Sequence, residues 1–351
     1  MAEQILIDPS RFSQFGPTAG SAFYFVTNPE LVDSFRLVHD GDYEKVETVV
    51  LGPEDDFAKL LDTEISDPAH ILVASPYRFF QSPDPEVLGE RRKLMAMACN
   101  STPTSLDSVR HFLGIMERTS AVEQDAFCDR FFTVAEDAEH LEYTNPVTGT
   151  RATLDHLRDG LVWNQQAGHL EWGEQQIVPS GEVSVLPLEI TEFDETLHLP
   201  LEGEITLRGY PILHSGTPSF SRGDQARIHK ALSAMEHHPI TARVTAGQIT
   251  ELTAVEPGAA PAVDMLEQMF AVDSRYRTVW EIGHALNSNL EILPGNHAMN
   301  EVYGGPKGCV HWGLGLTPFT QYHLDIISPE TVVTGGGTSQ TLLGNPAAVT
   351  T

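Results

Sequence analysis

Basic residues and long apolar runs are scarce in this chain of 351 residues. Only 21 residues are Lys or Arg against 49 Asp or Glu, which gives a formal net charge of −28 at pH 7. Non-specific binding to nucleic acid depends on clustered Lys and Arg that displace counterions, so the sequence predicts no nucleic-acid partner. No apolar run approaches the ~20 residues that cross a bilayer, so it also predicts no membrane partner.

Cysteine is scarce too. Cys99, Cys128 and Cys309 are odd in number, far apart and outside any C-x-x-C pair. This spacing argues against a disulfide framework and against a cysteine-based zinc site. The opening stretch, MAEQILIDPS, has neither the basic segment nor the long apolar segment of a secretory signal peptide. We therefore expect a reducing, cytoplasmic location.

The chain is long enough for two domains, and the pattern of apolar residues changes near residue 160. In residues 1–160, short apolar runs alternate with helical periodicity, which predicts an α/β domain with a parallel sheet. We interpret this domain as a scaffold that also forms a lid or a dimer contact. It contains no G-x-G-x-x-G motif and no P-loop, so no nucleotide site is expected. The expected strands are 46–51, 70–74 and 93–98, and the expected helices are 55–61, 105–119 and 121–139.

Residues 161–351 are rich in β-branched residues and in Gly and Pro at turns, which predicts an α+β, strand-rich domain that binds metal. The small, weakly charged residues 335–351 predict a flexible tail. The expected β-rich segments are 183–190, 197–213, 240–255 and 279–286, and the expected helices are 225–238 and 262–270.

Three residues near the end of this domain suggest a metal site. His323 and Asp325 are two apart in an apolar run, so on a strand both side chains point to the same face. A buried Asp is costly unless a partner offsets its charge, and a cation does so directly. His311 lies in a glycine-flanked apolar run twelve residues before His323. The alternative is a His–Asp hydrogen-bonded pair without a metal.

Two glutamates stand in similar settings. Glu182 follows a Pro-Ser-Gly turn at the start of a strand, and Glu281 lies inside the apolar run Val-Trp-Glu-Ile-Gly. Each of them alone is better explained as a solvated carboxylate at a strand end. With His311, His323 and Asp325 they form a mixed oxygen and nitrogen donor set. Such a set suits two Zn²⁺, Co²⁺, Mn²⁺ or Fe²⁺ ions, about 3.5–4 Å apart, with a bridging carboxylate.

Four motifs occur in a recognisable order: P-S-G-E-V, E-I-G-H-A-L-N, N-E-V-Y-G-G-P-K-G-C-V-H-W-G-L-G and Y-H-L-D-I. Over residues 175–335 the chain resembles the M29 family of metallo-aminopeptidases, the aminopeptidase T-like group. The resemblance implies a two-metal exopeptidase that removes amino-terminal residues from peptides or small amide metabolites. It also implies a homodimer and two divalent ions (Zn, Co, Mn or Mg). The implied metal ligands are Glu182, Glu281, His311, His323 and Asp325, with Glu281 as the bridge.

The same resemblance gives two catalytic candidates in addition to Glu281. Glu301 matches the Glu of the family's D-E-K element and is a candidate general base or pocket residue. The chain lacks the Tyr that some members place shortly after the first His, and Tyr322 and Tyr303 are the nearest substitutes. His284 is interpreted as an ordinary core or surface histidine, with a contact to a ligand or substrate as the alternative.

Two other functions remain open. A mononuclear iron dioxygenase that cleaves dihydroxypyridine rings resembles the same family, and His311, His323 and Asp325 would form its 2-His-1-carboxylate triad. Such an enzyme has no need of both Glu182 and Glu281, so their presence favours the two-metal hydrolase. The third possibility is a repurposed enzyme of specialised metabolism that keeps the metal cage but has an altered substrate pocket.

Overall fold

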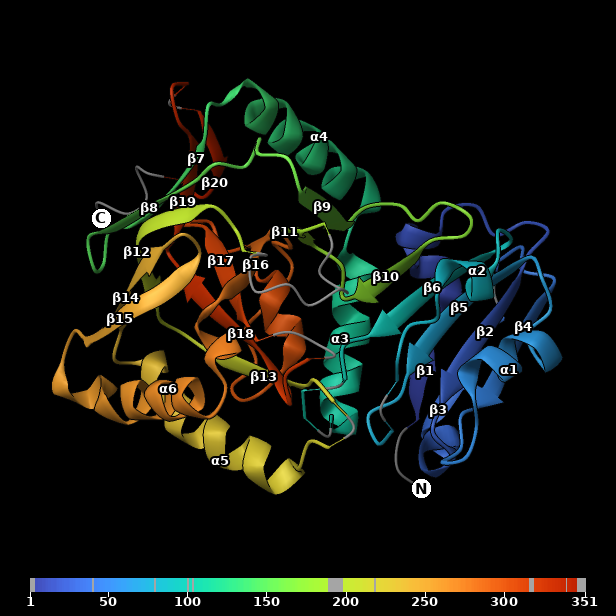
Figure 1. Cartoon of the computed structure of the whole chain (residues 1–351). Coiled ribbons are helices and arrows are strands. Elements are labelled where there is room, and N and C mark those ends of the chain that lie inside the picture. Colours follow the sequence, from blue (N-terminus) through green and yellow to red (C-terminus); the bar gives the residue numbers. More distant parts are fainter. Residues whose placement is uncertain are drawn as a thin grey trace. The chain divides into compact units, whose positions relative to one another are not determined.

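The computed structural model describes residues 4–39, 41–78, 80–99, 101–102, 104–188, 198–217, 219–315, 319–338 and 340–345 (Figure 1). The chain divides into two compact units, each built from two stretches. The first unit is Met1–Asp125 with Gln166–Ser180, and the second is Ala126–Gln165 with Gly181–Thr351. The division predicted after residue 160 falls inside the second unit, and separate folding of 1–160 and 161–351 stays a prediction.

The first unit contains a five-stranded, fully parallel sheet, as predicted for an α/β fold. Three of its strands match the expected ones, whereas the internal strand β2 was not predicted. Every residue of β2 is buried, so it shows none of the apolar–polar alternation that marks a half-exposed strand. In sheet order the strands are β10 (Gln175–Val178), β6 (Arg92–Met97), β5 (Ala69–Ala74), β2 (Ala22–Thr27) and β4 (Lys45–Val50).

Helices cover this sheet and begin at capping residues. The side chain of Asp56 accepts a hydrogen bond from the backbone N–H of Ala58, and Ser105 caps its helix in the same way through Ser108. The remaining elements are β1 (Ile5–Ile7), η1 (Pro9–Arg11), η2 (Ser13–Phe15), η3 (Pro29–Ser34), β3 (Phe35–Leu37), α1 (Phe57–Thr63), α2 (Pro85–Leu88), α3 (Leu106–Arg118) and α4 (Ala121–Asp137), which runs from the first unit into the second.

The second unit contains a seven-stranded antiparallel sheet. In sheet order its strands are β15 (Gln248–Ala254), β14 (Ile240–Thr245), β12 (Leu201–Leu207), β8 (Thr150–Leu154), β7 (Leu141–Asn145), β19 (Val332–Gly335) and β20 (Thr341–Leu343). The predicted flexible tail is wrong for β20, because Leu342 and Leu343 are buried and the strand pairs with β19. Residues 346–351 of that tail lie outside the described residues.

A six-stranded sheet completes the second unit. In sheet order its strands are β13 (Pro211–Ser215), β18 (Tyr322–Pro329), β17 (Cys309–Leu314), β16 (Val279–Ala285), β11 (Glu182–Pro187) and β9 (Leu161–Gln166). The helical elements are α5 (Arg222–Leu232), η4 (Ser233–Glu236), η5 (Pro257–Ala259), α6 (Ala260–Val272), η6 (Ser274–Arg277) and η7 (Ala298–Val302).

One face of the six-stranded sheet packs on the seven-stranded sheet. The buried indole of Trp312 donates a hydrogen bond to the Thr206 carbonyl on β12 at 3.0 Å, and the Ser328 hydroxyl donates to the same carbonyl at 2.8 Å. Since side chains alternate along a strand, the neighbours of Trp312 and Ser328 in sequence point to the opposite face. That opposite face carries the polar residues described below.

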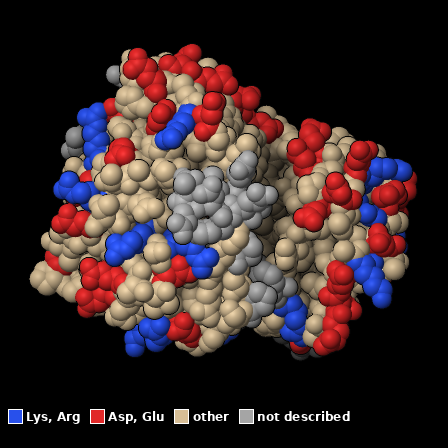
Figure 2. Space-filling view, in the orientation of Figure 1, with Lys and Arg blue, Asp and Glu red and all other residues tan. Residues whose placement is uncertain are grey.

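The surface shows mixed charge. On the face drawn in Figure 2, the described Lys and Arg residues stand singly or in small groups among Asp and Glu, and no broad basic patch is visible there. Among the described residues, no helix combines the length and the apolar character that a membrane crossing requires.

Candidate metal centre

Four strands of the six-stranded sheet bring the five predicted ligands together. Residues directly opposite on antiparallel strands share a face of the sheet. Gly313 on β17 lies opposite Glu281 on β16 and also opposite Asp325 on β18, which places both carboxylates on one face. By the period of two along a strand, His311 and His323 share it. Glu182, at the start of β11, joins them although it lies more than 140 positions from Asp325 in the sequence.

The other face of these strands is apolar and buried. Its residues alternate along each strand with the polar residues and are buried. This alternation explains why each motif has a polar residue inside an apolar run. The buried residues include Val183, Ile282, Val310, Trp312, Leu324 and Ile326. The sequence therefore builds a sheet with one largely apolar core face and one face that carries the ionisable cluster.

Two glycines make room for the cluster. A Cβ on Gly283 would lie 2.0 Å from Cε1 and 2.4 Å from Nε2 of His311, so the imidazole ring lies directly on the bare backbone. A Cβ on Gly313 would lie 2.8 Å from the Glu281 Cβ and 3.2 Å from Asp325 Oδ1. The glycines of the E-I-G and H-W-G segments are thus explained by close approach of the side chains above them.

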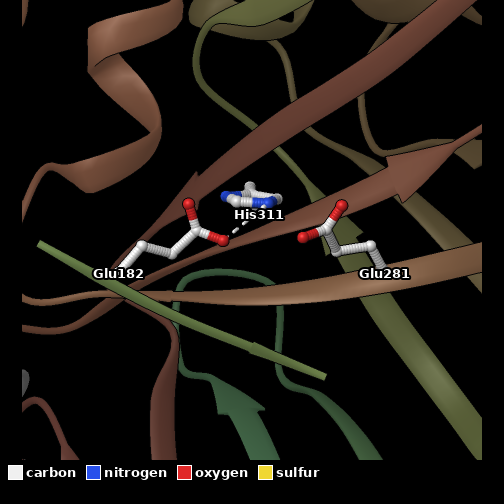
Figure 3. A group of neighbouring side chains, drawn as sticks. All are labelled: Glu182, Glu281 and His311. Atoms are coloured by element: carbon white, nitrogen blue, oxygen red, sulfur yellow. Dashed lines mark ion pairs between the residues drawn. The ribbon is translucent and has the colours of Figure 1, made fainter. Parts of the chain in front are cut away.

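Asp325 occupies the middle of the cluster, and its two oxygens face different histidines. Nε2 of His311 is 3.5 Å from Oδ1, whereas Nε2 of His323 is 3.1 Å from Oδ2. Nε2 of His311 also lies 3.7 Å from Glu182 Oε1, and Nε2 of His323 lies 3.7 Å from Glu281 Oε2. Figure 3 shows the carboxylates of Glu182 and Glu281 pointing toward one another, with the His311 ring between them.

These side chains form overlapping groups of the kind that hold metal ions. Glu182, Glu281 and His311 make one group, and Glu281, His323 and Asp325 make another. Within each group, one ligating atom per residue lies within 4.8 Å of the others. Glu281 belongs to both groups, as the predicted bridge requires, and the two oxygens of Asp325 make it a second bridging candidate.

The cluster contains two residues in addition to the predicted ligands. His214 on β13 lies opposite His323 on β18, and its Nε2 is 3.1 Å from Asp325 Oδ2 and 2.6 Å from Glu301 Oε1. Together with Asp325 they form a third group with metal-binding spacing. Glu301 was a candidate from the sequence. His214 was missed, although a histidine next to the apolar pair Ile212-Leu213 is the same signal that drew attention to His323.

Burial and crowded charge perturb the titration of the cluster. Burial disfavours the charged imidazolium of His311 and of His323, but the surrounding carboxylates outweigh it and raise both pKa values to about 9. Burial raises the pKa of Glu182 to about 8, aided by the negative charges of the other carboxylates. Burial acts against ionisation of Asp325 as well, yet the adjacent histidines, His323 first, hold the pKa of its carboxyl well below the usual range.

Two buried atoms at the centre have no hydrogen-bond partner: Asp325 Oδ1 and His311 Nδ1. A buried carboxylate oxygen without a donor is costly, and a cation between Asp325, His311 and Glu182 would remove that cost. The ring of His323 is already oriented, because its Nδ1 contacts the Gly315 carbonyl and its Nε2 faces Asp325. The donor set therefore fits divalent metal ions.

Other candidates from the sequence lie elsewhere. Tyr322 precedes His323 on β18, so its ring points to the other face, and its hydroxyl contacts the Ser221 carbonyl and Asp224 Oδ2 at the start of α5, both at 3.2 Å. The structure does not bring Tyr322 to the cluster, and we assign it no catalytic role. His284 is also on the core face, where Nδ1 contacts the Val183 carbonyl and burial lowers its pKa to about 3.

Comparisons with known proteins show the fold. No family model matches the chain, and no curated protein matches it in sequence. The 2,5-dihydroxypyridine dioxygenase from Pseudomonas putida KT2440 matches with a TM-score of 0.52 and 14% identity, over 93% of this chain and 92% of that one. AmpT from Thermus thermophilus matches with a TM-score of 0.49 and 14% identity, over 93% and 94%.

The likeness to the dioxygenase shows a shared fold, and the mixed α/β architecture with several sheets agrees with the predicted fold class. At this level of identity, neither neighbour tells what this chain binds or which reaction it catalyses. Membership of the M29 family therefore stays a prediction.

Proposed function

We propose that this chain is a hydrolase that uses two divalent metal ions to cleave amide bonds, most simply the bond to the amino-terminal residue of a peptide. One observation carries the proposal. The two oxygens of Asp325 face two different histidines, His311 and His323, and Glu281 belongs to the ligand groups of both. An inner position beside His311 and an outer position beside His323 would thus share two carboxylates.

The negative charge of the cluster favours two metal ions rather than one. Glu182, Glu281, Glu301 and Asp325 bring four negative charges into a largely buried cluster. Two divalent cations match those charges while the histidines remain neutral ligands. A single cation would leave two negative charges unmatched at short range, which is unfavourable at low dielectric.

The metal ions would acidify a bound water and polarise the scissile carbonyl. The chain's own residues supply the rest. Glu182 and His311 form the buried end of the cluster, with side-chain exposures of 11% and 2%. Glu281, at 20%, is the most exposed of the four carboxylates, and we place the substrate on its side of the cluster. Glu301 is the candidate proton acceptor for the attacking water.

Metal analysis combined with an amide-hydrolysis panel tests the proposal. The purified protein is stripped with a chelator, reloaded with Zn²⁺, Co²⁺ or Mn²⁺, and assayed on aminoacyl amides and short peptides. We expect close to two ions per chain and hydrolysis that depends on them. In Asp325→Asn both are lost while the far-ultraviolet circular dichroism is unchanged, whereas the exposed Asp264→Asn control behaves as the parent. Undiminished hydrolysis by Asp325→Asn, or two bound ions without cleavage of any amide, would show the proposal to be wrong.

A second candidate is a mononuclear Fe(II) dioxygenase that cleaves an aromatic ring. The fold is shared with a 2,5-dihydroxypyridine dioxygenase, and Nε2 of both His214 and His323 lies 3.1 Å from one oxygen of Asp325. Two histidines and one carboxylate are the usual ligand set of such iron sites. One iron per chain and oxygen uptake with a dihydroxylated ring would favour this candidate. The expected homodimer and cytoplasmic location, and the expected absence of nucleic-acid and membrane partners, stay predictions.

A further inference from the structure

His214 is paired in the sheet with His323, which we assign to the metal centre. It lies directly opposite His323 on the neighbouring antiparallel strand, so both side chains share the face of the sheet that carries the cluster. The two ring centroids are 5.9 Å apart, and the rings are inclined by only 31°. The imidazoles therefore approach Asp325 side by side, one from β13 and one from β18.

Asp325 is shared by the group that contains His214 and the group that contains His323, and the distance from each histidine to Asp325 suits two ligands of one ion. Nε2 of His214 and Nε2 of His323 are each 3.1 Å from Asp325 Oδ2. Donor atoms that each lie about 2.1 Å from one metal ion are separated by roughly 3.0–3.4 Å in octahedral or tetrahedral geometry. Both contacts fall within that range.

The backbone of β13 is held firmly beside this imidazole. Asn296 Oδ1 accepts a hydrogen bond from the Leu213 N–H at 2.7 Å, and the Leu213 carbonyl accepts bonds from Asn296 Nδ2 at 3.3 Å and from Gln225 Nε2 at 2.7 Å. The side chain of Leu213 is fully buried. An edge strand is thus fixed by two side chains at the residue before His214, as a preorganised ligand requires.

We propose that His214 is a ligand of the outer metal ion, together with His323, Glu281 and Asp325. The inference rests on the two-metal function proposed above and extends it. Each position then has four protein residues: two of its own, which are Glu182 and His311 for the inner ion, and the shared Glu281 and Asp325. Without His214 the outer ion would have only three.

A consequence concerns Glu301. In the metal-free chain its Oε1 lies 2.6 Å from Nε2 of His214, the same nitrogen that would bind the ion. A metal-bound Nε2 has no proton to donate, so loading releases the Glu301 carboxylate at the exposed end of the cluster. The competing explanation is that His214 only positions Glu301 and never contacts the metal.

Metal binding by His214→Asn decides between these explanations. The whole chain is stripped and titrated with Co²⁺, and bound metal is counted at equal free metal. Loss of a partner that only orients a ligand costs about 10–100-fold in metal affinity, so loss of a direct ligand should weaken the outer ion by on the order of 100-fold or more. His214→Asp, which keeps a donor atom, should recover much of the binding. The exposed His237→Asn control should bind as the parent does.

Paramagnetic proton spectra of the Co²⁺ protein give a readout independent of activity. Each metal-bound imidazole retains one exchangeable N–H with a strongly shifted signal. We expect three such signals in the parent, from His214, His311 and His323, and two in His214→Asn. Two signals in both proteins with unchanged affinity would overturn the inference. A parent that binds one ion or cleaves no amide would instead refute the two-metal hydrolase, while the histidine signals would still decide whether His214 is a ligand.

Discussion

Replacing Gly283 with alanine tests the geometry of the cluster directly. The new Cβ would lie 2.0 Å from Cε1 of His311, and ordinary contact begins near 3.4 Å. The imidazole ring must therefore move by about 1.4 Å, which is 3.4 Å less 2.0 Å. The ring is only 2% exposed and Asp325 and Glu182 lie beyond it, so it has little room to do so.

The expected result of Gly283→Ala has two parts. Overpacking of this kind costs about 1–3 kcal/mol in the free energy of unfolding. Metal–ligand distances tolerate changes of only about 0.2 Å, so the inner ion should be lost even where the sheet survives. Equilibrium urea unfolding of the metal-free protein measures the first effect, and metal counting measures the second. Gly223→Ala is the matched control, because the nearest atom to its new Cβ is 3.8 Å away, on Ser221.

A double-mutant cycle shows whether the His311 ring is the cause. In a His311→Ala background the obstructing ring is gone, so Gly283→Ala should cost little, and the two changes should couple by about 0.5–3 kcal/mol. If the losses in the free energy of unfolding were additive, or if Gly283→Ala bound metal normally, then contact between residue 283 and the His311 ring would not be the cause.

Three further predictions follow from the same contacts. The metal-free chain should lose stability as pH rises from about 6.5 to 9, because the pKa values of His311 and His323 are raised from 6.5 to about 9. Glu182, whose pKa is raised from 4.5 to about 8, adds a loss that begins near pH 4.5. Stabilisation by a group with a raised pKa is complete below its unfolded value and is lost as pH passes the folded value. Thermal melts across this range check the prediction, and a melting temperature that rises with pH would contradict it. Tyr322→Phe should lower the free energy of unfolding by about 0.5–1.5 kcal/mol through loss of its contacts at the start of α5, with hydrolysis and metal content within about twofold of the parent; a large loss of activity would return Tyr322 to the catalytic site. His284→Leu should destabilise the chain by about 1–3 kcal/mol, since it leaves the Tyr143 hydroxyl and the Val183 carbonyl without their partner, but it should keep both ions, as metal counting would show.

Local patterns predicted much of the fold. Apolar runs marked β4, β5, β6, β11 and β16, and helical periodicity marked α3 and α4. No strand was predicted at β2, although β5, which is equally buried on both faces, was predicted from its apolar run. The β-rich segment expected at residues 197–213 contains β12 and the start of β13, which Gly209, at φ 102°, separates. A Cβ there would lie 2.9 Å from Pro329, a contact that only the fold creates.

Part of the candidate site could also be predicted from local sequence patterns. Each of Glu182, Glu281, His311 and Asp325 is an ionisable residue in an apolar strand, and that contradiction is visible in the sequence because burial of charge needs compensation. The catalytic role expected for Tyr322 stays a prediction. Neighbours on a strand point to opposite faces, so only the strand pairing shows that its ring lies away from the cluster.

The sequence by itself determined the kind of chemistry: carboxylate and imidazole donors at strand positions, glycines beside them, and an acidic chain without cysteine ligands. The tertiary structure decided which donors meet. Strand order places β13 beside β18, and this brings His214 to Asp325 across 111 positions of sequence. The physical reason is that donor type is a property of single residues, whereas distance to a shared ion depends on strand pairing, which is set by burial of the whole opposite face.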